Sequence, residues 1–147
     1  MTLQDWLNSG WLKRHNTSNQ EISDLLAKIE RDIAESNKEE ITLDWRLAIA
    51  YNACLGCATI ALRVSGYRIS GGSGQHYRTI QSLRFTINPD PQIIASLEAI
   101  SRKRAIVSYD AAGTITELKS WKHSYWCRVF LGFFRNYRWT AFRNTVI

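Results

Sequence analysis

The stretch from Leu43 to Val64, LDWRLAIAYNACLGCATIALRV, constrains the fold more than any other part of the chain. It carries no charge between Arg46 and Arg63, and its apolar residues fall on every side of a helical wheel. A helix that is apolar all round is buried inside a protein or embedded in a membrane. The uncharged part, Leu47 to Leu62, is shorter than the about 20 residues that a bilayer span requires. We therefore expect a buried central helix rather than a membrane span, so the central helix gives no reason to expect a membrane partner.

Capping signals and apolar spacing predict the helices that surround it. The capping box Ser18-x-x-Glu21 opens a helix that ends near residues 36–37. The glycine-rich segment 70–74 predicts a flexible loop, and a shorter helix is expected over Gln75–Arg84. Thr42 can cap the central helix, and Gly66 closes it.

The last third of the chain predicts two more helices. Asp90 as N-cap and Pro91 as first residue begin a helix that reaches Tyr109. A second capping box, Thr114-x-x-Glu117, opens a final helix. No stretch predicts a strand or an internal repeat. The expected fold class is all-α, an antiparallel bundle of four to five helices over residues 1–121.

The excess positive charge lies entirely near the C-terminus. Residues 1–117 hold 13 basic and 13 acidic side chains, whereas residues 118–147 hold six basic and none acidic. The tail, residues 122–147, is basic and aromatic, and it shows no period past Gly132. Three interpretations stay open: a C-terminus that is not native to the bundle, a membrane-surface or anionic-partner segment, or a segment that stacks on single-stranded nucleic acid.

Cysteine and histidine usage gives little sign of a metal or cofactor. Cys54 and Cys57 sit inside the central helix with no second ligand pair, so we expect buried, reduced thiols in a cytoplasmic protein. His15 and His123 have unremarkable polar neighbours. His76 precedes Tyr77 and Arg78 beside the flexible loop and is a candidate binding residue; the alternative is a solvated histidine at a helix start.

The best candidates for catalytic or binding residues lie between Ser101 and Asp110. Helical spacing places Arg102 and Tyr109 on one face, about 10 Å apart. Arg104 falls in an apolar seam, where an unpaired guanidinium would cost several kcal/mol. An anionic group should meet it: a carboxylate, a phosphate or a partner chain. The alternative is structural, since cations offset the dipole at a helix end and Glu98 could pair with Arg102.

These features resemble the HEPN family of small helical bundles from toxin–antitoxin and defence systems. The resemblance covers roughly residues 3–117 and rests on the helix order, the apolar third helix and the motif R-K-R-x4-Y-D. In active members an arginine, followed after four to six residues by a histidine, cuts RNA across a dimer without a metal. Arg102 and Arg104 fit that spacing, but Tyr109 replaces the histidine. A tyrosine, with an ordinary pKa of about 10, is a poor base at neutral pH.

The resemblance implies a cytoplasmic homodimer that binds RNA or nucleotide phosphates. Arg102, Arg104 and Tyr109 would form its catalytic group, with Lys103, His76 and Arg78 binding RNA or phosphate. Whether the protein is a metal-independent endoribonuclease or has lost cleavage is left open. An antitoxin or nucleotidyltransferase partner is a further expectation. The alternatives are a non-enzymatic protein-interaction module and a membrane-surface protein acting through the tail.

Overall fold

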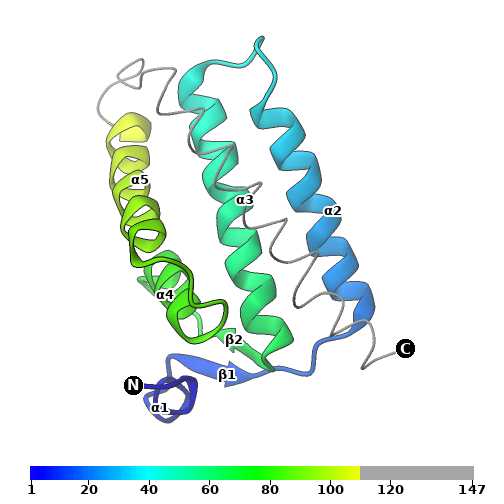
Figure 1. Ribbon diagram of the computed structural model, residues 1–147, viewed down its shortest axis with the longest axis vertical. Coiled ribbons are helices and arrows are strands. Elements are labelled where there is room, and N and C mark those ends of the chain that lie inside the picture. The colour runs from blue at the N-terminus through cyan, green and yellow to red at the C-terminus, as the bar shows by residue number, and fades with distance from the viewer. Residues whose placement is uncertain (110–147) are drawn as a thin grey trace.

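The structure, a computed structural model, describes residues 1–109, with backbone alone for Leu43 and residues 103–109. Three long helices form its body: α2 (Asn19–Ser36), α3 (Leu43–Val64) and α5 (Pro91–Tyr109). Figure 1 shows α3 between the other two, with the short helix α4 (Gln75–Ser82) beneath α5. The described chain is mostly helical, as predicted. The helix predicted from Thr114, the boundary at residue 121 and the tail 122–147 lie outside the described residues.

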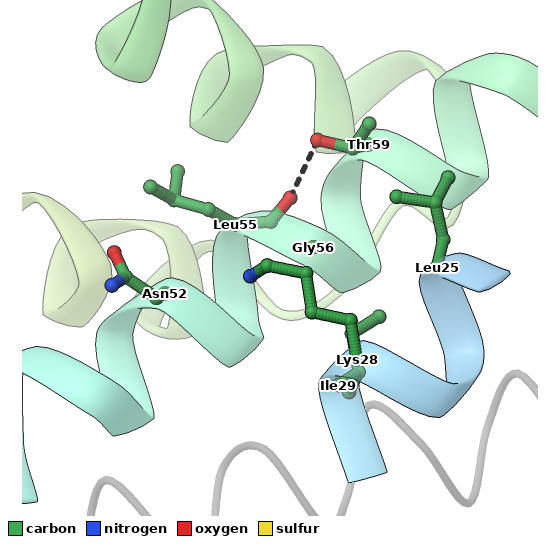
Figure 2. A pocket seen from close by; sticks show the side chains of 7 residues that line it. All are labelled: Leu25, Lys28, Ile29, Asn52, Leu55, Gly56 and Thr59. Atoms are coloured by element: carbon green, nitrogen blue, oxygen red, sulfur yellow. Dashed lines mark hydrogen bonds between the residues drawn. The ribbon is translucent and has the colours of Figure 1, made fainter. Parts of the chain in front are cut away.

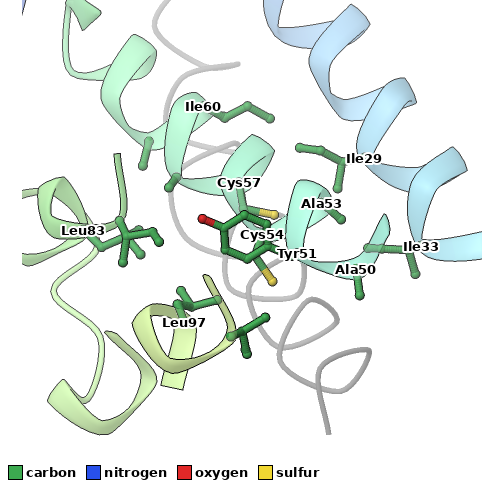
Figure 3. Close-up of a cluster of buried hydrophobic side chains, with 14 of the residues drawn as sticks. Ile29, Ile33, Ala50, Tyr51, Ala53, Cys54, Cys57, Ile60, Leu83 and Leu97 are labelled. Carbon is green, nitrogen blue, oxygen red and sulfur yellow. The ribbon is translucent and has the colours of Figure 1, made fainter. Parts of the chain in front are cut away.

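Helix α3 supplies half of the buried hydrophobic residues within the described part of the chain. Its buried side chains face α2 on one side and α4 and α5 on another, and Figure 3 shows Tyr51, Cys54 and Cys57 among them. By length and composition α3 could cross a membrane, but 56% of its most apolar window is buried inside the molecule. The packing fits a central core helix, and both cysteines are free, buried thiols, as predicted.

The helix ends agree with most of the capping predictions. Ser18 caps α2, because its Oγ accepts from the backbone N–H of Glu21 at 3.1 Å. The reciprocal half of that capping box is wrong, because the Glu21 side chain turns to other partners. Thr42 is the N-cap residue of α3 without a side-chain hydrogen bond, and Gly66 follows the helix with a φ of +91°.

A complete capping box opens the short helix α1 (Leu3–Asn8) instead. Thr2 Oγ1 accepts from the backbone N–H of Asp5, and the Asp5 carboxylate accepts from the backbone N–H of Thr2 at 2.7 Å. Hydrogen bonds from the hydroxyl and then the backbone of Thr2 lower the pKa of Asp5 below its ordinary value. The carboxylate therefore stays charged where it favours the helix start.

Helices α4 and α5 follow the predicted boundaries closely. The predicted helix over Gln75–Arg84 is α4 followed by one 3-10 turn, η1 (Leu83–Phe85). Asp90 starts α5, since its Oδ1 accepts from the backbone N–H of Gln92 at 2.9 Å. Among the described side chains of α5, Ile94, Leu97 and Ile100 are buried in the core, and Ile93 packs against it. Leu97 and Ile100, which precede Arg104 at helical spacing in the predicted apolar seam, are thus buried, while the side chain of Arg104 lies outside the described part.

The expectation of no strands is wrong. Two three-residue strands, β1 (Leu12–Arg14) and β2 (Tyr67–Ile69), pair antiparallel into a ribbon below the three long helices (Figure 1). Leu12 is paired with Ile69 and is buried in a small second core with Trp6 and Leu62. Strands this short show no alternation in the sequence, because three residues complete less than two periods. Burial of Leu12 and flanking backbone hydrogen bonds, from Ser70 to Trp11 and from His15 to Gly66, hold the ribbon in place.

Candidate nucleic-acid interface

The arginine-rich part of α5 lies well away from the ribbon. Arg102 is exposed and is the twelfth residue of α5, about 17 Å along the helix from Pro91. Figure 1 shows that α5 starts beside α4 and runs away from the ribbon. Lys103, Arg104 and Tyr109 lie in the last two turns of the same helix.

The predicted alternative partner of Arg102 is engaged elsewhere. The carboxylate of Glu98 accepts a hydrogen bond from Nε2 of Gln81 and so joins α5 to α4. Within residues 1–102, where side chains are described, Arg102 forms no salt bridge with Glu98. Its exposed guanidinium is therefore accessible from solvent.

The two binding candidates on α4 have different neighbours. His76 is exposed, and its ring centroid is 6.1 Å from that of Tyr51. The guanidinium carbon of Arg78 lies 4.9 Å from the ring centroid of Trp11, the residue before β1. The structure thus brings Arg78 to the ribbon, whereas Arg102 lies toward the other end of α5.

Two segments without acidic residues meet at the ribbon. Residues 6–20 and 63–89 together hold six Lys and Arg, two histidines and no Asp or Glu: Lys13, Arg14, Arg63, Arg68, Arg78, Arg84, His15 and His76. By contrast, residues 21–62 hold eight acidic and four basic side chains. The pairing of β1 with β2 brings the two acid-free segments together. We call the part of the molecule formed by these two segments the basic end.

At the centre of the basic end two like charges face each other. Lys13 of β1 is directly opposite Arg68 of β2, so both side chains leave the same face of the ribbon, and both are exposed. Like charges directly opposite each other on neighbouring strands are destabilising. A bound anion would remove that repulsion and would gain two charge-assisted hydrogen-bond donors.

One ion cluster fixes the ribbon to the helices. Nε2 of His15 lies 2.9 and 2.8 Å from the two carboxylate oxygens of Glu21, and Nη1 of Arg63 lies 2.7 Å from one of them. Thr17 Oγ1 donates to the backbone carbonyl of Arg63 at 2.7 Å. In this cluster the positive charge of Arg63 is paired with the carboxylate of Glu21. The remaining cations of the basic end have no acidic partner within the described side chains: Lys13, Arg14, Arg68, Arg78 and Arg84.

The hollow between α2 and α3 has different chemistry. Figure 2 shows its lining, which is mainly apolar and includes Leu25, Lys28, Asn52 and Leu55. Its volume of about 240 Å³ is below the range of about 300–1,000 Å³ typical of small-molecule sites. Thr59 donates its hydroxyl hydrogen to the carbonyl of Leu55 rather than toward the hollow. No group of His, Cys, Asp and Glu within the described residues could hold a metal ion.

Sequence reasoning missed the ribbon residues Lys13 and Arg68, and it placed His15 in an ordinary setting. The charge pattern offered a signal, since two runs, residues 6–20 and residues 45–89, lack any acidic side chain. That these runs are neighbours could not be read from the sequence, because the whole of α2 and α3 lies between the two strands that join them.

Comparison with known proteins adds no assignment to this geometry. No protein-family model matches the chain, and no curated protein or solved structure gives a significant match. The charge and geometry of the basic end are therefore the observations that indicate a function.

Proposed function

We propose that this protein binds RNA through its basic end. The observation that carries the proposal is the cross-strand pair of Lys13 and Arg68, two exposed cations held opposite each other with no described acid beside them. RNA presents regularly spaced phosphates, and cationic side chains that neutralise them release counterions, which drives association. The two segments of the basic end hold no acidic residue, and the neighbouring Glu21 is paired with Arg63, so little repulsion opposes the incoming phosphates.

The resemblance to HEPN proteins supplies the cellular setting of the proposal. On that basis the protein acts as a cytoplasmic homodimer in a toxin–antitoxin or defence system. The exposed Arg102 and its helical neighbours Lys103 and Arg104 offer a second cationic element for the same RNA. Because Tyr109 stands where active members have histidine, the proposed activity is binding with slow or no cleavage.

A charge-reversal experiment on the full chain tests the binding site. Labelled transfer RNA would be titrated with the wild type, with Arg68→Glu and with Arg31→Glu, an equal charge change on the exposed face of α2. We expect Arg68→Glu to weaken binding at least tenfold, because it removes one phosphate contact and adds a repulsive charge. Arg31→Glu should change the affinity less than twofold, because salt screens charges beyond about 10 Å.

Stability separates a lost contact from a damaged fold. Arg68→Glu places an acid opposite Lys13, so the variant should unfold at the same or a slightly higher urea concentration than the wild type. A variant that is equally stable and binds less RNA supports the proposal. Equal loss of binding in both variants, or no RNA binding by the wild type at low salt, contradicts it and favours a protein-interaction module.

Cleavage and assembly are measured on the same preparations. Transfer RNA incubated with the protein in EDTA should remain intact over the time needed for binding equilibrium. Rapid metal-independent cleavage that disappears in Arg104→Ala would show an active ribonuclease and would overturn the binding-only part of the proposal. Light scattering after gel filtration should give twice the mass of 16.9 kDa for the homodimer.

A further inference from the structure

Exposed aromatic and guanidinium groups accompany the cations at the basic end. Tyr77 in the first turn of α4 is 61% exposed, and Trp11 before β1 is 36% exposed. The guanidinium carbon of Arg78 lies 4.9 Å from the Trp11 ring centroid, and that of Arg14 lies 6.0 Å from the Tyr67 ring centroid. Flat groups suited to stacking therefore lie in the same segments as the cations.

The two guanidinium–aromatic pairs, Arg78 with Trp11 and Arg14 with Tyr67, can contact a ligand by stacking as well as by charge. A guanidinium held over an aromatic ring loses little conformational freedom when it meets a ligand, because the ring already orients it. Unpaired RNA bases stack on aromatic rings and on guanidinium planes. An exposed tyrosine such as Tyr77 offers both a ring face and a hydroxyl to a ligand.

The loop before α4 is rich in glycine and leaves open space around it. Gly71, Gly72 and Gly74 have no atom within 4 Å of the position that a Cβ would occupy. Gly72 and Gly74 adopt φ values of +118° and +78°, which residues with a Cβ rarely adopt. The backbone of Ser70 is fixed to the ribbon by donation of its N–H to the carbonyl of Trp11 at 2.9 Å. This loop thus connects the ribbon to α4 without bulky side chains.

We propose that the basic end selects single-stranded RNA, with unpaired bases stacked on Tyr77 and on the Arg78–Trp11 pair while Lys13 and Arg68 hold the phosphates. The inference rests on the proposed function and adds a substrate class to it. In a duplex the bases already stack on one another, and the major groove of A-form RNA is too deep and narrow for side chains to read. Cationic side chains alone would bind duplex and single-stranded RNA alike. A preference for single-stranded RNA therefore indicates that bases stack on the protein.

Fluorescence anisotropy of the full chain tests the preference. The probes are oligouridylate and oligoadenylate of about 12 nucleotides, within the usual site size of single-strand binders, a duplex of equal length, and inorganic polyphosphate as competitor. We expect both single strands to bind at least tenfold more tightly than the duplex. Oligoadenylate should bind more tightly than oligouridylate, because purines stack over a larger area.

Substitutions at position 77 test whether Tyr77 causes the preference for single-stranded RNA. Tyr77→Ala should weaken single-strand binding about tenfold, the effect expected for one stacked base, and Tyr77→Phe should restore most of it. Competition by polyphosphate should be unchanged in both variants. Trp45→Ala removes an equally exposed aromatic side chain, 66% exposed on α3, and should leave binding within twofold of the wild type.

The outcomes distinguish this inference from the proposed function. Equal affinity for duplex and single strand, or equal affinity of Tyr77→Ala and wild type for oligoadenylate, overturns the stacking inference. If Arg68→Glu still weakens RNA binding in that case, the proposed function stands. If neither RNA form binds, both proposals fail together.

Discussion

At position 56 the absence of a side chain lets α2 and α3 come close. A Cβ added to Gly56 would lie 2.7 Å from Cγ1 of Ile29 and 3.0 Å from its Cδ1. Ile29 is buried and β-branched, so it has few alternative rotamers. Glycine in a helix interior is otherwise unfavourable by about 1 kcal/mol relative to alanine. Close packing of α2 against α3 thus explains why glycine, a residue with low helix propensity, occupies position 56.

We expect Gly56→Ala to destabilise the protein. The steric overlap should cost about 1–3 kcal/mol, which outweighs the gain of about 1 kcal/mol in helix propensity. Urea unfolding should therefore show a loss of about 1 kcal/mol, a value that combines these two estimates. Asn52→Ala, at an exposed position of the same helix, serves as the control and should not destabilise.

The double variant identifies the cause. If overlap with Ile29 is responsible, Gly56→Ala should cost less in an Ile29→Ala background than in the wild type, a coupling that a double-mutant cycle measures. A stabilising effect of Gly56→Ala in the wild type would mean that α2 moves aside at negligible cost.

At the scale of elements, the ribbon is connected to the helices by a cluster of three charged or titratable side chains. Glu21 on α2 meets His15, which follows β1, and Arg63 in the last turn of α3. The three side chains are only about a quarter exposed. Hydrogen bonds between charged groups at such partly buried positions contribute more than exposed ones. Glu21 therefore holds the basic end in place while its own charge is balanced.

Glu21→Gln should lower the free energy of unfolding by about 1–2 kcal/mol, because Arg63 would keep its charge and lose its carboxylate. Glu35→Gln is the matched control. Glu35 pairs with Lys38 at 2.7 Å, but both side chains are at least 40% exposed, so its loss should cost less than about 0.5 kcal/mol. Equal effects in urea unfolding would show that the cluster adds nothing beyond a surface ion pair.

At the scale of the whole molecule, charge is segregated along the chain and in space. The acid-free segments meet at the ribbon, whereas the eight acidic residues of 21–62 belong to α2, the following loop and the start of α3. Such segregation orients a polyanion toward one end of the molecule before contact. It also predicts how RNA binding depends on salt.

The logarithm of the RNA association constant should fall linearly with the logarithm of the salt concentration. Each phosphate contact on a single strand contributes a slope of about −0.7. Arg68→Ala should therefore make the slope shallower by about 0.7 relative to the wild type. Lys28→Ala on α2 is the control and should leave the slope unchanged. If Arg68→Ala and Lys28→Ala change the slope equally, RNA does not bind at the basic end.

The sequence by itself determined the three long helices, because their signals are local. Ser18 and Asp90 at helix starts, Gly66 after a helix end and the uncharged run of α3 marked the boundaries before any contact was known. The free, buried state of Cys54 and Cys57 followed from the same run. The helix start at Asp90 and Pro91, together with helical spacing, placed Arg102 and Tyr109 on α5.

Only the tertiary structure decided which distant segments of the chain are neighbours in space. The strands β1 and β2 are three residues long and far apart in the chain, so no local sequence period predicts them. Burial of Leu12 in the second core and backbone hydrogen bonds on either side of the strands hold them together. The same contact sets Lys13 opposite Arg68 and gives Glu21 partners outside its own capping box. Long-range pairing depends on the free energy of the whole packed chain, which a local sequence pattern does not contain.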